Sequence, residues 1–173
     1  MNHTEYWRCS YEKNQQHHFL DRVIEKQNRG EIAGVTSICS ANSEVLKAAL
    51  IHAQKIKGVA LIESTCNQVN QYGGYTGMTP LQFVKYLRAM SERIGLSYGK
   101  LLIGGDHLGP NVWKKEPTVT AMGKSRILVR DYIRAGYQKI HIDSSMRCAD
   151  DPQHAPLAPK EIAERTADLA AVS

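Results

Sequence analysis

Acidic and imidazole side chains follow three apolar segments of the 173-residue chain. Asp106 and His107 stand between glycines, which permit a sharp turn and the close approach of a ligand. His141 and Asp143 are two residues apart, so on a strand both would point to the same side. Glu63 ends a further apolar segment. Residues of these types supply general acids, general bases and ligands of divalent metals.

We therefore predict that Asp106 and Asp143 are catalytic groups. The predicted metal ligands are His107, His141 and Glu63, and the cofactor would be zinc or another divalent metal. The alternative is a group of polar side chains that bond only to one another and hold no metal.

A long polar loop, CNQVNQYGGYTGMTP at 66–80, follows the segment that contains Glu63. Loops of this length on the functional face of an α/β fold are often lids or binding loops, and amides and hydroxyls suit hydroxylated sugars. A glycine turn before a capped helix would explain only the last residues of the loop. The predicted substrate-binding residues, from this loop and from two later strand ends, are Asn67, Gln68, Asn70, Gly73, Gly74, Asn111 and Ser144.

The elements that must position these residues alternate between short apolar runs and longer segments with helical periodicity. A polar helix is expected before Gly30. Strands are expected at 32–39, 58–64, 100–106 and 139–143, and helices at 40–56, 80–95, 120–136 and 159–170. Four strands that alternate with four helices predict a parallel sheet covered by helices.

Two architectures satisfy this alternation. A doubly wound sheet would be complete at this length, whereas a (β/α)8 barrel commonly needs about 250 residues. The first strand-to-helix turn, SICSANSE, lacks the glycines of a dinucleotide fingerprint, and no P-loop pattern occurs in the sequence. The pattern of elements leaves both architectures open.

The composition excludes several classes of protein. The net charge is +5, but basic and acidic residues are interleaved, so we expect no nucleic-acid binding. No apolar run approaches the roughly 20 residues that span a bilayer, and the first ten residues do not resemble a signal peptide. Cys9, Cys39, Cys66 and Cys148 are isolated and are expected to be free thiols. These features predict a cytoplasmic protein without membrane contact.

Four segments resemble one known family. CNQVNQYGGYTGMTP (66–80), GGDHLGPN (104–111), AGYQKIHIDSSM (135–146) and CADDP (148–152) are similar to those of the GatZ/KbaZ family. Members of this family are the non-catalytic subunit of class II D-tagatose-1,6-bisphosphate aldolase. The resemblance covers about residues 30–173 and implies a TIM-barrel fold, work in galactitol or N-acetylgalactosamine catabolism, and a separate zinc-dependent catalytic subunit as partner.

The resemblance also implies that 31–173 form only the N-terminal half of a (β/α)8 barrel, preceded by a polar helical segment at 1–30. We then expect no independent aldolase or kinase activity, since half of the barrel and any P-loop are missing. Open sheet edges would favour self-association, and so would whichever of the side chains Val35, Leu61, Ile103 and Ile140 point inward and meet water. Some relatives resemble ketose-phosphate 4-epimerases. The alternative function is therefore a metal-dependent epimerase of this kind, or an aldolase-like enzyme, in which a bound metal and the strand-end acids would act on tagatose or fructose phosphates.

Overall fold

A computed structural model describes residues 17–152 and 154–172 of the chain, and its contacts divide the chain into two units, 1–36 and 37–173. In the first unit, α1 (His17–Asn28) is the expected polar helix. It ends just before Gly30, which adopts a φ of 77° that glycine tolerates without strain. The Gln27 amide then donates a hydrogen bond of 2.9 Å to the carbonyl oxygen of Ala33.

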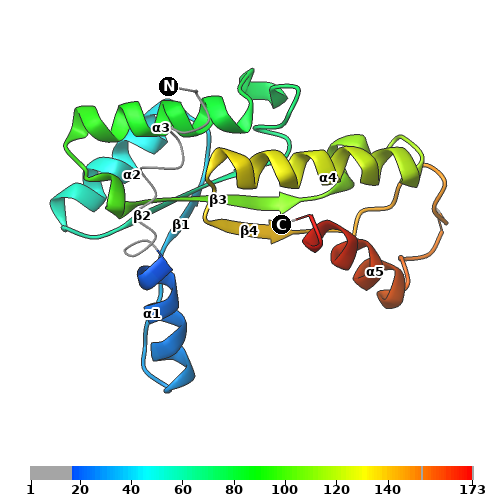
Figure 1. Cartoon of the computed structure of the whole chain (residues 1–173), viewed down its shortest axis with the longest axis horizontal. Coiled ribbons are helices and arrows are strands. Elements are labelled where there is room, and N and C mark those ends of the chain that lie inside the picture. The colour runs from blue at the N-terminus through cyan, green and yellow to red at the C-terminus, as the bar shows by residue number, and fades with distance from the viewer. Residues whose placement is uncertain (1–16, 153, 173) are drawn as a thin grey trace, which may run out of the picture. The chain divides into compact units, whose positions relative to one another are not determined.

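The second unit is built on one sheet of four parallel strands (Figure 1). These are β1 (Ser37–Cys39), β2 (Ala60–Thr65), β3 (Leu101–Leu108) and β4 (Lys139–Ile142). Their spatial order is the chain order, β1-β2-β3-β4. The register pairs Glu63 with both Cys39 and Gly104, and Thr65 with Asp106. Polar residues of neighbouring strands therefore lie at the same level of the sheet.

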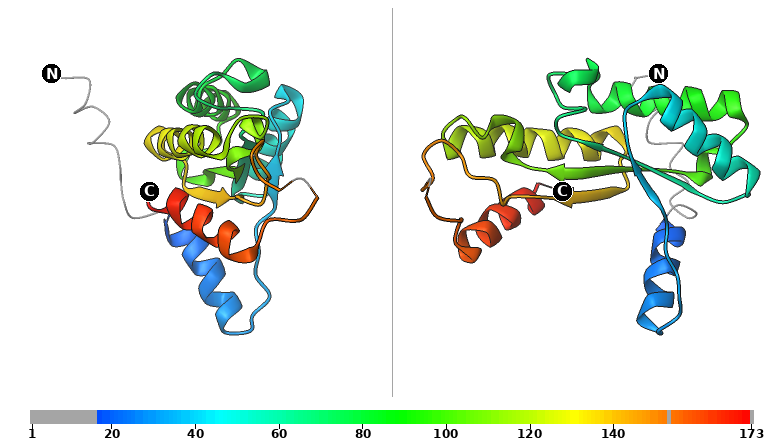
Figure 2. Two further views of the ribbon diagram at one scale, coloured as in Figure 1. Left: turned by 90° about the vertical axis from the view of Figure 1, so that its right-hand side faces the viewer. Right: turned by 180° about the vertical axis from the view of Figure 1, so that it is seen from behind.

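Each strand is followed by a helix, as the sequence predicts. The helices are α2 (Ser43–Lys55), α3 (Pro80–Ile94), α4 (Thr118–Ala135) and α5 (Pro159–Ala170). Three short 3-10 helices lie in the connections: η1 (Gly74–Thr76), η2 (Tyr98–Lys100) and η3 (Pro110–Trp113). Consecutive helices contact one another, and Figures 1 and 2 show α2, α3 and α4 side by side along the sheet.

The strand order decides between the two architectures. A doubly wound sheet reverses its strand order at a switch point, whereas a barrel adds each strand beside the previous one. Because crossovers between parallel strands are right-handed, a continuous order places successive helices on one face. The order β1-β2-β3-β4 is that of a barrel. The fold is therefore α/β of the (β/α)8-barrel type, with four βα units in this chain.

The hydrophobic core lies between the sheet and its helices. Ile62 of β2 and Ile103 of β3 are fully buried there, with Leu50, Phe83 and Leu128 of three helices. The helix ends follow the predicted chemistry: Asn42 accepts hydrogen bonds from two backbone N–H groups of α2, and the Gln82 side chain accepts one from the backbone N–H of Thr79. Apolar side chains at the spacing of a helical turn therefore bury one face of each helix.

Three cysteines are free thiols, as predicted, namely Cys39, Cys66 and Cys148; Cys9 lies outside the described residues. Among the helices that the structure describes, none combines the length and apolar character needed to cross a bilayer.

We expect the 173-residue chain alone to self-associate, because β1 and β4 are the outer strands of the described sheet and offer unpaired backbone groups. Of the four side chains expected to meet water if they point inward, Leu61 and Ile103 are buried, at 3% and 0% exposed, whereas Val35 and Ile140 are half-buried. The prediction therefore depends mainly on the strand edges. Light scattering after size-exclusion chromatography at several dilutions measures it, and a monomer at every concentration would contradict it.

Candidate functional site

Asp106, His107 and His141 meet where β3 and β4 end. The Asp106 carboxylate lies between the two imidazoles, with Oδ1 2.8 Å from His141 Nδ1 and Oδ2 3.0 Å from His107 Nδ1. The ring centroids of the two histidines are 4.5 Å apart. The histidine side chains are 56% and 44% exposed, while that of Asp106 is 17% exposed. The site is therefore a shielded carboxylate beneath two accessible imidazoles.

A bulge in β3 brings His107 to this side of the sheet. Residues 105 and 108 pair with 140 and 142, so β3 has one extra residue in this interval. His107 adopts a φ of 51°, in the left-handed region that costs a residue with a side chain about 1–2 kcal/mol. Regular alternation would have sent Asp106 and His107 to opposite faces. Strain of this kind is often found at functional sites.

The electrostatics of the site favour the ionised form of Asp106. Burial by itself raises the pKa of this carboxyl, but hydrogen bonds from His141 and His107 outweigh it and hold the pKa below its usual value. Asp106 is therefore an anion at neutral pH. It can orient both imidazoles and can act as a ligand for a cation.

Asp143 lies in the turn that follows β4. Burial raises the pKa of its carboxyl, but the Ser145 hydroxyl and backbone N–H both donate to Oδ1, at 2.6 and 2.9 Å, and the net pKa is lowered. Its backbone N–H donates to the carbonyl oxygen of Leu108 at 2.9 Å. Gly109 fits beside this turn only because it lacks a side chain: a Cβ there would be 1.8 Å from the carbonyl oxygen of Asp143.

Glu63 does not join the histidines. Its carboxylate bonds instead to the Lys139 ammonium and to the Ser37 hydroxyl, and the residue is only 4% exposed. Gly104 lies between Glu63 and Lys139 in the register, and a Cβ there would be 2.7 Å from Glu63 Oε1. Lys139 therefore reaches Glu63 across a glycine of β3.

Lys139 and Ser37 are not among the site residues predicted from sequence. Strand alternation indicates Lys139, because this residue is two positions before His141 and shares its face. Cys39 was also missed. Its thiol pKa is raised to about 11, first by burial and then by the nearby charge of Asp106, so this thiol borders the site as a neutral group.

The loop between β2 and α3 uses several of the predicted binding residues to hold its own shape. Asn70 is 4% exposed; its Oδ1 accepts from the backbone N–H groups of Tyr72 and Gly74, and its Nδ2 donates to the carbonyl oxygen of Cys66. Gln68 Oε1 accepts from the backbone N–H of Thr65 at 2.8 Å. These contacts indicate a preformed loop.

The two glycines of the loop allow its backbone segments to pack closely. Gly73 and Gly74 adopt positive φ angles of 102° and 56°. A Cβ on Gly74 would lie 2.4 Å from the carbonyl oxygen of Gln68. Asn67 is exposed, and its backbone carbonyl oxygen accepts a hydrogen bond of 3.0 Å from the backbone N–H of Tyr75. Substrate binding by these residues stays a prediction, since their observed contacts are within the loop.

The remaining predicted residues follow the later strands. Asn111 is half-buried in η3, directly after the turn that contains Gly109. Ser144 is 1% exposed, and its hydroxyl has no hydrogen-bond partner within the described part of the chain. The structure thus brings Asp106, His107 and His141 together, and it places the other predicted residues around them or in the adjoining loops.

A divalent cation fits the ligand types of this group. One ligand atom from each of Asp106, His107 and His141 lies within 4.8 Å of the others. Two imidazoles and a carboxylate suit zinc and related metals, and three protein ligands leave a coordination position for water or substrate. The three side chains also satisfy one another by hydrogen bonding, so metal binding stays a prediction.

Replacing His107 with alanine should abolish any metal binding and change the free energy of unfolding by less than about 1 kcal/mol, because the side chain is exposed and the left-handed backbone remains strained. His107→Gly removes the same ligand and should be the more stable of the two variants, since glycine accepts this φ. Metal analysis and urea unfolding test both. Retained metal with a large fall in melting temperature would show that His107 is a packing residue.

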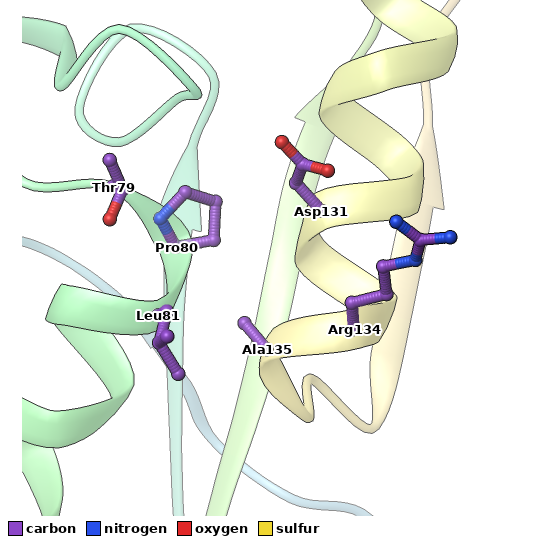
Figure 3. A pocket seen from close by; sticks show the side chains of 6 residues that line it. All are labelled: Thr79, Pro80, Leu81, Asp131, Arg134 and Ala135. Atoms are coloured by element: carbon purple, nitrogen blue, oxygen red, sulfur yellow. The ribbon is translucent and has the colours of Figure 1, made fainter. Parts of the chain in front are cut away.

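One cavity lies apart from this site, between the start of α3 and the last turns of α4 (Figure 3). Its volume is about 220 Å³, and it is lined by Thr79, Pro80, Leu81, Asp131, Arg134 and Ala135. Asp131 is paired there with the neighbouring Arg130 at 3.0 Å. None of the predicted site residues contributes to this cavity.

Comparison with known proteins finds one family that matches most of the chain. Residues 20–173 match the family described as D-tagatose-1,6-bisphosphate aldolase subunit GatZ/KbaZ-like. Proteins named D-tagatose-1,6-bisphosphate aldolase subunit GatZ, from Escherichia coli K12 and from the E. coli O139:H28 strain E24377A, are each 48% identical to it over 150 residues. The alignment covers 87% of this chain but 35% of each relative, so the chain spans about a third of the length of these proteins.

A solved structure is similar as well. The crystal structure of a probable tagatose 6 phosphate kinase from Sinorhizobium meliloti 1021 matches 80% of this chain and 35% of its own, with 49% sequence identity and a TM-score of 0.77. The four βα units thus correspond to part of a longer chain with the same local fold.

Proposed function

Because the chain belongs to the D-tagatose-1,6-bisphosphate aldolase subunit GatZ/KbaZ-like family, we propose that it acts as a non-catalytic subunit of class II tagatose-1,6-bisphosphate aldolase. In this role it supports the activity and stability of a separate zinc-dependent catalytic subunit during galactitol or N-acetylgalactosamine catabolism in the cytoplasm. The observation that carries the proposal is the 48% identity over 150 residues to subunits of this name.

The arrangement of the chain supports a role in an assembly. The loop between β2 and α3 is held by its own hydrogen bonds and presents Tyr72 and Tyr75, which are 68% and 72% exposed. Exposed tyrosines on a preformed loop lose little conformational freedom on binding and are frequent anchors of protein interfaces. This surface is available to a partner subunit without rearrangement of the loop.

Co-expression with a class II tagatose-bisphosphate aldolase catalytic subunit tests the proposal. We expect the two chains to co-purify. In the presence of this chain, the catalytic subunit should have higher aldolase activity and a longer half-life than in its absence. The 173-residue chain by itself should show no aldolase activity and no ATP-dependent kinase activity. Failure to co-purify together with unchanged aldolase activity would contradict the proposed role.

A second candidate function follows from the group of Asp106, His107 and His141, whose ligand atoms lie within 4.8 Å of one another. It is a metal-dependent ketose-phosphate 4-epimerase. A bound divalent cation would supply Lewis-acid polarisation of the ketose oxygens. Asp143, ionised because its pKa is lowered, would take the proton of the C4 hydroxyl as the C3–C4 bond breaks. It would return that proton after the aldehyde has presented its opposite face and the bond has formed again.

Metal content separates the two candidates. An aldolase-supporting subunit can function without metal, whereas the epimerase requires one metal per chain. Elemental analysis after purification with added zinc or manganese, followed by NMR of tagatose 6-phosphate incubated with the protein, measures both properties. Absence of metal and of fructose 6-phosphate formation would eliminate the epimerase for this chain.

A further inference from the structure

The segment between β4 and α5 surrounds a second cavity, of about 530 Å³. Three of its lining residues are polar, Ser145, Arg147 and His154. The rest of the wall is formed by Ala155, Pro156, Leu157 and Ile162. The volume lies within the range of small-molecule sites and is larger than a single inorganic ion needs.

The charge of this wall favours an anion. Its described lining includes a guanidinium, an imidazole and a hydroxyl but no carboxylate. The acids of the same segment are engaged elsewhere: Asp151 and Glu161 both pair with Arg165, and Asp150 accepts from the backbone N–H and hydroxyl of Thr118. A negatively charged ligand therefore meets donors on the polar side of the cavity.

Hydrogen bonds and an ion pair connect described residues around the cavity. Arg147 Nη1 donates to the carbonyl oxygen of Ala155 at 3.1 Å, which links the two sides of the loop. The buried pair of Asp151 and Arg165 ties the same loop to α5. Leu157 is 6% exposed, so this residue of the cavity wall is buried. Binding to such a preformed wall costs little conformational entropy.

Ser145 connects the cavity to the turn that contains Asp143. This residue lines the cavity, and its hydroxyl and backbone N–H also donate to Asp143, which follows β4 by one residue. A ligand with an anionic group in the cavity could therefore extend its hydroxylated part toward Asp143 and His141. Sugar phosphates combine these two features.

We propose that the cavity between β4 and α5 binds the phosphate group of a sugar phosphate, with Arg147 as its main donor and His154 as a further donor. The planar guanidinium matches phosphate oxygens through two parallel hydrogen bonds. The apolar wall of Pro156, Leu157 and Ile162 packs against the carbon chain next to the phosphate. This inference rests on the proposed function only for the choice of a sugar as the remainder of the ligand.

Calorimetry with the 173-residue chain tests the site with three probes: inorganic phosphate, tagatose 1,6-bisphosphate and tagatose. We expect the two phosphate-bearing probes to bind and to compete, and tagatose to show no binding under the same conditions. Arg147→Gln should weaken phosphate binding about tenfold or more, because hydrogen bonds to a charged group are lost. Arg126→Gln is the matched control, since Arg126 pairs with Asp168 and does not line the cavity. Its phosphate affinity should be unchanged.

A measurement on the unaltered chain guards against a variant that fails to fold. Phenylglyoxal modification followed by peptide mass spectrometry reports the reactivity of each arginine. Phosphate should slow the modification of Arg147 several-fold and leave Arg126 unaffected. Equal protection of both residues, or no protection of Arg147, overturns the proposed site.

The outcomes separate this inference from the proposed function. Protection of Arg147 without co-purification of the aldolase catalytic subunit would contradict the subunit role and leave the phosphate site standing. Co-purification without protection of Arg147 would do the reverse. Binding of tagatose as tight as that of tagatose 1,6-bisphosphate would overturn the phosphate preference.

Discussion

Replacing Gly109 with alanine is expected to lower the free energy of unfolding by about 3 kcal/mol, at the upper end of the usual cost of overpacking. The added Cβ would lie 1.8 Å from the carbonyl oxygen of Asp143, and backbone atoms cannot move away as a flexible side chain can. The turns after β3 and β4 would have to separate, which would break the hydrogen bond from the Asp143 N–H to the Leu108 carbonyl oxygen. The group of Asp106, His107 and His141 would lose its geometry at the same time.

Gly123→Ala is the matched control, because Gly123 lies inside α4 and a Cβ there meets no atom within 4 Å. This variant should gain about 0.5–1 kcal/mol, since alanine favours a helix over glycine. Urea unfolding followed by circular dichroism compares the two variants. A Gly109→Ala protein as stable as the unaltered chain would mean that the two turns are not in the contact described.

Replacing Asp151 with asparagine is expected to cost about 3 kcal/mol, at the lower end of the range for removing one partner of a buried ion pair. The Asp151 carboxylate accepts hydrogen bonds from Arg165 Nη1 and Nη2, at 2.9 and 2.6 Å, and from the backbone N–H of Cys148 at 2.6 Å. The two side chains are only 6% and 8% exposed. Glu161 still contacts Arg165 in the variant, and for this reason the loss should not reach the upper end of the range.

Asp168→Asn provides the control for this charge change. Its partner Arg126 is 46% exposed and Asp168 is 36% exposed, so the expected loss is below about 1 kcal/mol. Thermal unfolding of both variants at neutral pH gives the comparison. Equal losses would show that burial does not set the strength of the Asp151 pair.

The pH dependence gives a second test of the Asp151 pair. Hydrogen bonding from Arg165, more than any other contact, lowers the pKa of Asp151 in the folded chain. The stability that this carboxylate contributes is therefore present above its unfolded pKa, about 3.9, and is lost as the pH falls through the lower folded pKa. The stability difference between Asp151→Asn and the unaltered chain should shrink below about pH 4.

Local sequence determined which elements form in this protein. Apolar runs of strand length, the capping residue Asn42, and glycines such as Gly95 and Gly136 act within a few residues of their own positions. Their effects depend on backbone sterics and local hydrogen bonds, which are similar in any fold. The proximity of His141 to Asp106 also follows from the sequence, because polar residues at the ends of neighbouring parallel strands lie at the same edge of the sheet.

The tertiary structure alone decided the order of the strands and the partners of the polar groups. The order separates a barrel from a doubly wound sheet, and it depends on contacts between residues that are distant in the chain. The bulge at His107 overrides regular alternation, and the carboxylate of Glu63 bonds to Lys139, 76 residues away in sequence, rather than to a histidine. A carboxylate bonds to whichever donor the packed strands bring near it, and no local pattern around Glu63 specifies that donor.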